Sequence, residues 1–221
     1  MSHWNQRLLR QVRGMWMVAI AIACAMGGTA LRAEAAVIAS WNLNGIDPLQ
    51  NTVVSASTGV GTLDFGGLGS TATTLQGTTL GALKGELAGD SLAAIGTLAN
   101  GTSMRFDFET TGYQDLTVSF ATRRSATGAS SNRIECWTGL AWETVLQFTS
   151  NATTWELVSV KLGAVGISGS GYASMRLVLD GATSSSGSLR FDNISVSGSP
   201  VPAPGALALL GLAGCVARRR R

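Results

Sequence analysis

Apolar and polar residues alternate along most of the middle of this chain. Residues 102–110 read TSMRFDFET, and residues 114–122 read QDLTVSFAT. In the first run, Met104, Phe106 and Phe108 occupy every second position, and charged residues fill the positions between them. A period of two places alternate side chains on opposite faces of a β-strand, whereas a helix buries residues spaced three or four apart. The pattern therefore restricts this region to strands buried on one face.

Runs of this kind recur between residues 36 and 199, separated by turns rich in Gly, Ser, Thr and Asn. The predicted strands are 37–43, 72–80, 90–95, 102–109, 114–121, 132–138, 142–149, 154–162, 172–180 and 188–197. Short strands at this spacing are typical of antiparallel sandwiches. We therefore predict one all-β domain over residues 36–199, an antiparallel two-sheet sandwich of jelly-roll type.

Two segments of this domain have a weaker pattern. Residues 55–80 are the least patterned and predict a long surface loop. Residues 78–96 read TTLGALKGELAGDSLAAIG, in which Leu80, Leu83 and Leu87 have a near-helical spacing. A helix is the alternative there, but glycine disfavours helix interiors, so we expect strand and loop.

The first 35 residues have the three parts of a secretory signal peptide. A basic stretch is followed by an apolar run over residues 15–31, and the segment ends in Ala33-Glu34-Ala35. Small residues at Ala33 and Ala35 are what a signal peptidase requires. We predict a signal helix over residues 1–35 that is cleaved after Ala35; an uncleaved membrane anchor is the alternative.

The last segment, residues 200–221, differs from the domain in composition. It begins with a tetrapeptide made of Val201, Pro202, Ala203 and Pro204. An uncharged, mostly apolar run follows over residues 205–217, and the chain ends in Arg218, Arg219, Arg220 and Arg221. As a helix this run would rise roughly 20 Å, less than the ~30 Å hydrocarbon core of a bilayer. Terminal arginines stay on the cytoplasmic side. We predict a short transmembrane helix that holds the chain transiently in the inner membrane; an amphipathic helix of the domain is the alternative.

The order of these three parts resembles the PEP-CTERM sorting signal of Gram-negative bacteria. Val201, Pro202 and Pro204 match its V-P-x-P motif, while Ala203 stands where the family usually has Glu. The resemblance implies processing by an exosortase and delivery to the cell surface or the extracellular matrix. It also implies an association with exopolysaccharide, because such systems accompany exopolysaccharide production.

The charge of the chain is concentrated in its two ends. Residues 36–200 contain eight Lys and Arg against twelve Asp and Glu, a net charge of −4, although the whole chain is at +3. The domain therefore offers no basic face to collect phosphates, and we expect no binding of nucleic acid. The same stretch contains Cys136 as its one cysteine and no histidine. We expect Cys136 to be a buried small hydrophobe.

Three stretches of the domain resemble jelly-roll domains of secreted bacterial surface proteins, which include sandwiches similar to carbohydrate-binding modules. They are residues 39–45 (ASWNLNG), 116–138 and 176–198. The resemblance implies that the first strand pairs with the last, which here contains Phe191-Asp192-Asn193-Ile194. It also implies that Asp192 could bind a structural Ca²⁺, as the equivalent acid does in some of those domains. Asp47 and Asp180 are then possible partners.

Aromatic residues are the candidates for ligand contacts. Sugars stack on exposed aromatic rings while polar neighbours bind their hydroxyl groups. Trp137 and Trp142 flank a predicted turn, and we take them as the candidate ligand-binding residues. We expect Trp41 and Trp155 in the core, and Tyr172 at a strand edge.

Catalysis has weaker support than binding in this sequence. Without a histidine in residues 36–200, Ser-His-Asp catalysis and histidine-ligated zinc have no residues to use. Paired carboxylates could still hydrolyse a glycoside, and Asp107 with Glu109 or Glu135 with Glu143 are the candidate pairs. We predict a non-catalytic exported protein that associates with exopolysaccharide and binds glycan. The alternatives are a glycan hydrolase and a purely structural matrix protein.

Overall fold

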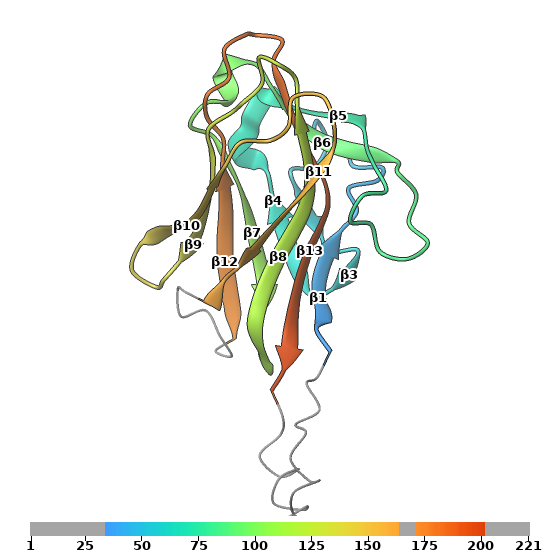
Figure 1. The fold of residues 1–221 in the computed structure, drawn as a ribbon, viewed down its shortest axis with the longest axis vertical. Helices are drawn as coiled ribbons and strands as arrows, with labels where there is room; N and C mark the ends of the chain where they lie inside the picture. The colour runs from blue at the N-terminus through green and yellow to red at the C-terminus, as the bar shows by residue number, and fades with distance from the viewer. Residues whose placement is uncertain (1–33, 164–170, 202–221) are drawn as a thin grey trace, which may run out of the picture. The chain divides into compact units, whose positions relative to one another are not determined.

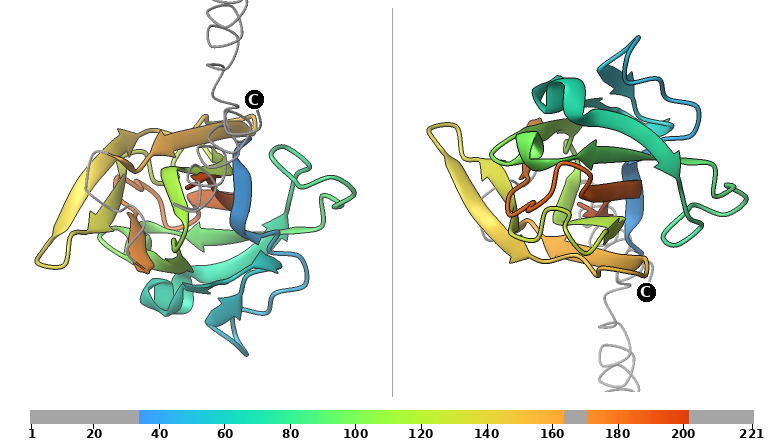
Figure 2. Two further views of the ribbon diagram at one scale, coloured as in Figure 1. Left: turned by 90° about the horizontal axis from the view of Figure 1, so that it is seen from below. Right: turned by 90° about the horizontal axis from the view of Figure 1, so that it is seen from above.

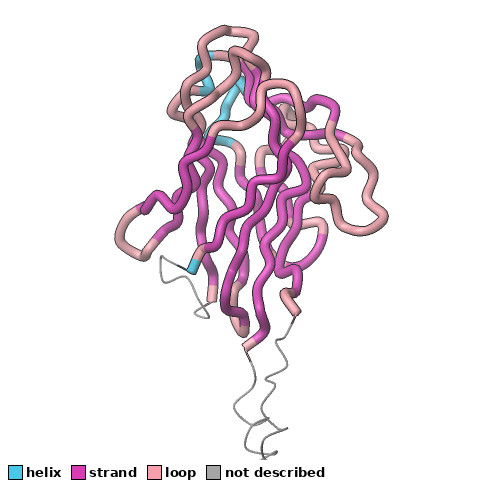
Figure 3. The backbone as a smooth tube through the Cα atoms, in the orientation of Figure 1, coloured by secondary structure: helices cyan, strands magenta, loops and turns pink. Residues whose placement is uncertain are grey.

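The computed structural model describes residues 34–163 and 171–201. Residues 1–33 of the predicted signal helix, and the predicted sorting signal after Val201, lie outside the described residues. Within them the fold is all-β, a two-sheet antiparallel sandwich (Figure 1). Figure 3 shows that helical turns occupy only short segments of the described chain. None of the described helical turns is long and apolar enough to cross a membrane.

One sheet has seven strands. Five follow the order β11-β8-β13-β1-β3, and β6 pairs with β13 and with β5. Their bounds are β1 Ala36–Trp41, β3 Thr58–Gly59, β5 Ala72–Gln76, β6 Asp90–Ile95, β8 Tyr113–Arg124, β11 Glu156–Lys161 and β13 Ser188–Pro200. The first and last strands are antiparallel neighbours, with Trp41 beside Ile194, which confirms their expected pairing. In Figure 1, β1 therefore begins and β13 ends at the same end of the sandwich.

The other sheet has six strands in the order β10-β9-β12-β7-β4-β2. Their bounds are β2 Val53–Ser55, β4 Gly61–Asp64, β7 Ser103–Glu109, β9 Asn132–Trp137, β10 Trp142–Phe148 and β12 Tyr172–Val178. In Figures 1 and 2 the β9–β10 hairpin, drawn in yellow, and the loop of residues 77–89, drawn in green, project from opposite sides of the sandwich.

The alternation of the sequence accounts for the core between the sheets. Met104, Phe106 and Phe108 are each at most 2% exposed, and the same holds for Leu116 and Val118. Burying each such side chain stabilises the fold by about 1.5–3 kcal/mol. Each predicted strand is present, because the period of two is a local property of each run. Most ends shift by at most three residues, but β5 ends at Gln76 and not at residue 80.

The predicted surface loop over residues 55–80 is wrong. That region contains β3, β4, the 3-10 turn η1 (Gly66–Thr71) and β5. β4 pairs with β7, so that Leu63 lies beside Phe106 and is fully buried. Strand β4 offers a single inward residue, too little for a periodic signal, and its partner is distant in sequence. The helical alternative for residues 78–96 is also wrong, because Asp90–Ile95 is strand β6 and no α-helix occurs in residues 77–89.

Cys136 lies on the inner side of β9 and is fully buried. Burial raises the pKa of its thiol to about 12, because a buried thiolate loses its hydration. The predicted role of Cys136 as a small core hydrophobe is confirmed. The prediction is also confirmed for Trp41, which is 1% exposed, but not for Trp155, which is half-buried just before the edge strand β11.

Candidate functional site

The outer face of the six-stranded sheet places polar and aromatic side chains in one row. Trp142 pairs with Trp137, Ser174 with Asp107, Asp107 with Thr62, and Thr62 with Ser55. Met175 pairs with Cys136, so antiparallel geometry places Ser174 beside Trp137. The resulting row, here called the outer row, crosses the sheet through Trp142, Trp137, Ser174, Asp107, Thr62 and Ser55. With neighbouring strands about 4.8 Å apart, it extends for roughly 24 Å.

The two tryptophans meet at one end of the outer row. Their ring centroids are 5.5 Å apart, with the planes tilted by 56°. Trp137 is 41% exposed, whereas Trp142 is half-buried and the Arg176 guanidinium lies 4.5 Å from its ring centroid. One side of Trp142 is therefore occupied by a cation–π contact. Trp137 offers the more accessible ring for a ligand.

A buried carboxylate lies beside the tryptophans. Arg133 donates through Nε to Oε1 of Glu135 at 2.5 Å, and Arg176 donates through Nε to Oε2 at 2.6 Å. Burial alone would raise the pKa of Glu135, but the hydrogen bonds and charges of Arg176 and Arg133 outweigh burial and lower it. Glu135 therefore stays ionised and fixes both guanidinium groups. Its side chain is only 8% exposed, against 37% for Arg133 and 32% for Arg176.

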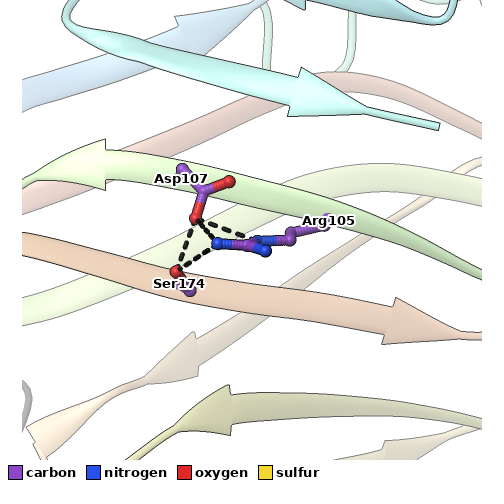
Figure 4. Close-up of polar contacts among 3 residues, drawn as sticks. All are labelled: Arg105, Asp107 and Ser174. Atoms are coloured by element: carbon purple, nitrogen blue, oxygen red, sulfur yellow. Dashed lines mark hydrogen bonds and ion pairs between the residues drawn. The ribbon is translucent and has the colours of Figure 1, made fainter. Parts of the chain in front are cut away.

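A second polar cluster lies farther along the sheet (Figure 4). Arg105 donates to Oδ1 of Asp107 through both Nε and Nη2, at 3.0 and 2.8 Å, and Nη2 also donates to Ser174. Ser174 in turn donates its hydroxyl to Asp107. The Arg105 side chain is 54% exposed, so the ion pair contributes at most about 1 kcal/mol to stability. Its main effect is to hold three polar groups in fixed positions on the surface.

The outer row ends in a groove of about 340 Å³. Asp107, Thr62 and Ser55 of the row line it, together with Val60 and Tyr172 among others. Tyr172 is 70% exposed, because it lies at the start of β12 opposite Glu109. The groove therefore combines an aromatic ring with hydroxyl and carboxylate groups.

The structure separates one of the two candidate carboxylate pairs. Glu143 pairs with Cys136, whose side chain is buried in the core, whereas Glu135 lies on the outer face. Because paired residues share a face, Glu135 and Glu143 point to opposite sides of the sheet and cannot act together. Asp107 and Glu109 do share the outer face. Within the described residues, however, the side-chain partners of Asp107 are Arg105 and Ser174, not Glu109.

Asp192, the predicted calcium ligand, lies at an irregularity of β13 and is fully buried. Its Oδ2 accepts the backbone N–H of Thr78 at 2.6 Å, and its Oδ1 accepts that of Asn193 at 2.8 Å. Burial raises its pKa to about 7; the two backbone hydrogen bonds oppose this rise, and the charges of Glu86 and Asp90 add to it. The described residues give this carboxylate no basic partner.

Carbonyl oxygens lie near the Asp192 carboxylate around Gly77. A Cβ atom added to Gly77 would lie 2.3 Å from the carbonyl oxygen of Ala88, 2.4 Å from Oδ2 of Asp192 and 2.7 Å from the carbonyl oxygen of Asp90. Oxygens from two chain segments, residues 88–90 and Asp192, thus lie close to the Cα of Gly77. Ca²⁺ accepts carboxylate and carbonyl oxygens together. Asp192, Ala88 and Asp90 are the residues that would hold it, and it would neutralise the buried carboxylate.

The other two acids suggested for this site make hydrogen bonds within their own turns. Asp47 accepts the N–H of Leu49, and Asp180 accepts that of Gly181, so each shapes a local turn. In residues 34–163 and 171–201, no group of three His, Cys, Asp or Glu side chains gathers to hold a metal ion. A cation at Asp192 would therefore depend on backbone carbonyls, whose positions no sequence motif marks.

Several residues of the outer face were not among the sequence candidates. Arg133 and Arg176 are the clearest, since each contacts Glu135. The sequence did contain a signal that Arg133 and Glu135 belong to the same face as Trp137, because the three residues alternate in the run RIECW. Arg176 had no such signal, because its place beside Glu135 depends on the pairing of β12 with β9.

Comparisons with known proteins found structural similarities at low sequence identity. No family model matches the chain, and no curated protein matches it. Among solved structures, it is similar to the xylan-binding module CBM15, at 10% identity over 59% of this chain and 99% of that one, with a TM-score of 0.40. It is also similar to the CBM22-1–GH10 modules of Clostridium thermocellum xylanase 10B, at 13% identity and a TM-score of 0.40.

That second match covers 63% of this chain and 27% of the xylanase chain, so this chain spans about a quarter of it. A third similar structure is the K3 cleaved adhesin domain of Lys-gingipain from Porphyromonas gingivalis, at 12% identity over 59% of this chain and 92% of that one, with a TM-score of 0.36. Two of these similar structures are carbohydrate-binding modules or contain one by name.

Proposed function

We propose that this chain is a non-catalytic glycan-binding protein and that the outer face of its six-stranded sheet is the binding surface. The observation that carries the proposal is the outer row. It joins the exposed ring of Trp137 to a groove lined by Tyr172, with the fixed polar groups of Asp107 and Ser174 between them. Flat apolar rings suit the C–H face of a sugar, and fixed polar groups suit its hydroxyls.

A loss of binding in aromatic variants tests this function. In affinity gel electrophoresis of the purified chain against xylan, galactan, polygalacturonate and alginate, we expect at least one polysaccharide to retard migration. Trp137→Ala and Tyr172→Ala should each weaken that binding about tenfold or more, because exposed aromatic anchors dominate such interfaces.

Trp155→Ala is the matched control, since Trp155 precedes β11 in the other sheet and should leave binding unchanged. Equal retardation of wild type and both face variants would contradict the proposed surface. Binding to none of the polysaccharides would favour the structural matrix role instead. Release of reducing sugar would favour the hydrolase, with Asp107 and Glu109 as its remaining pair.

We also propose that the chain is exported and processed at both ends. In support, β1 begins at Ala36, directly after the predicted cleavage at Ala35, and β13 ends at Pro200, directly before the V-P-x-P motif. An exported domain of this extent would retain every strand. The proposed partners are signal peptidase, an exosortase and exopolysaccharide.

Mass spectrometry of the protein recovered from the producing bacterium tests export. We expect the mature N-terminus at Ala36 and a C-terminus that lacks Arg218–Arg221. Replacing Pro202 and Pro204 with alanine should leave the arginine cluster in place and keep the chain in the membrane fraction. An extracellular product that retains residues 1–35 would contradict the proposal.

A further inference from the structure

The charge on the outer face is unevenly distributed. Arg105 and Asp107 balance each other in the second cluster, and Asp64 pairs with Arg105. Glu109 adds negative charge beside Tyr172 of the groove. Beside the tryptophans, two arginines share the single carboxylate of Glu135. Within the described residues, these are the only ion pairs that Arg133 and Arg176 make. The two guanidinium groups and the one carboxylate beside the tryptophans therefore sum to a charge of +1.

The geometry of the two arginines leaves their terminal nitrogens available. Each donates to Glu135 through Nε, at 2.5 and 2.6 Å, and the described residues include no hydrogen bond from their Nη atoms. Both side chains are about one third exposed, whereas Glu135 lies below them at 8%. An approaching ligand therefore meets guanidinium N–H groups and not the carboxylate.

These guanidinium groups are also held in place before a ligand arrives. Glu135 fixes both through hydrogen bonds, and the ring of Trp142 lies under Arg176 at 4.5 Å. A guanidinium presents paired N–H donors that match the two oxygens of a carboxylate, and such charge-assisted bonds are stronger than neutral ones. Holding both groups in place reduces the conformational entropy lost on binding.

We infer that Arg133 and Arg176 receive the carboxylate of an acidic sugar, so that the glycan bound on this face contains uronate units. The inference rests on the glycan-binding function proposed above. Trp137 follows Glu135 by two residues and lies on the same face of β9. It would contact the ring of the same sugar or of the adjacent one. The acidic groove end would accept neutral units through their hydroxyls.

The experiment compares each acidic polysaccharide with its own neutral form. Polygalacturonate, alginate and glucuronoxylan are used as prepared and after chemical reduction of their carboxyl groups, which keeps the backbone and removes the charge. We expect the purified full-length chain to bind at least one native form about tenfold more tightly than its reduced form. Added salt should weaken the native interaction more than the reduced one.

Two variants assign the preference to these arginines. Arg176→Gln should lower the affinity for the native form to that for the reduced form. Arg176→Lys keeps the charge but not the paired donors, and should retain only part of the preference. Arg123→Gln is the matched control, because it removes the same charge from β8 of the other sheet and should keep the preference.

Several outcomes would overturn the inference. Equal binding of native and reduced forms would contradict it while leaving the glycan-binding function intact. Binding to no polysaccharide would contradict both. Dextran sulfate bound as tightly as the best uronate would show a general anion contact and not a carboxylate site. An unchanged preference in Arg176→Gln would place the contact elsewhere on the face.

Discussion

The Trp41→Ala variant is expected to lose about 3–5 kcal/mol of its free energy of unfolding. Trp41 is 1% exposed and belongs to β1 in the seven-stranded sheet. Its ring packs edge-on against Phe106 of the other sheet, with centroids 5.6 Å apart. A Cβ on Gly61 would lie 2.9 Å from the Trp41 ring, so the facing strand already approaches it closely. Truncation would leave a cavity where the two sheets meet.

Urea denaturation followed by circular dichroism measures this loss. Trp41→Phe should cost considerably less, because it keeps an aromatic ring. It also leaves no partner behind, since the Trp41 indole N–H donates to no hydrogen-bond acceptor among the described residues. Trp137→Ala serves as the control for an exposed tryptophan and should change stability by less than about 1 kcal/mol. A loss below about 1 kcal/mol in Trp41→Ala would mean that Trp41 does not join the two sheets.

Asp192 should make the metal-free domain less stable as the pH rises. Its pKa is raised to about 7 in the folded state, against 3.8 for the ordinary side chain. Between these values the folded protein holds a proton that the unfolded chain has released. The stabilisation is therefore fully present below about pH 4 and is lost as the pH rises through about 7. The effect is on the order of a few kcal/mol.

Thermal melts in EDTA between pH 4 and pH 8 measure this effect. Glu135 affects the pH dependence of stability in the opposite direction. The wild type is therefore compared with Asp192→Asn, which retains Glu135 but has no titrating group at position 192. The lowered pKa of Glu135 gives stability that is present above its unfolded pKa and lost as the pH falls. The wild type should lose more stability on going to pH 8 than the variant does. Identical pH profiles would contradict a titrating Asp192.

Calcium should reverse the trend if Asp192 binds it. A cation favours the ionised carboxylate, so Ca²⁺ should raise the melting temperature of the wild type at pH 8 and much less at pH 5. Asp192→Asn should lose most of that response. No calcium-dependent shift at pH 8 would exclude the cation site while leaving the buried carboxylate as described.

The sequence was most informative where structure depends on neighbouring residues. The alternation in residues 102–110 predicted both the strand and its buried side, because a period of two needs no knowledge of the partner strand. The same local rule placed Trp41 in the core and Trp137 near Trp142 at a hairpin. It failed for Trp155, because burial there depends on β11 being an edge strand.

The candidate site depends on contacts between distant segments. Arg176 lies 41 positions from Glu135, and the Asp192 carboxylate accepts a backbone N–H 114 positions away in Thr78. Neither contact follows from the period of either strand. The strand order β9-β12-β7 brings Arg176 and Asp107 onto one face with Trp137, and that order depends on packing between sheets and not on any single run.

By itself, then, the sequence determined the all-β class, most strands and their inward residues, because the alternation acts over a few residues at a time. Only the tertiary structure decided which outward residues became neighbours. Sheet pairing joins segments far apart in the chain, and its register sets which charges meet. The shared carboxylate of Glu135 and the oxygens around Gly77 are both products of that pairing, since each gathers groups from separate strands or loops.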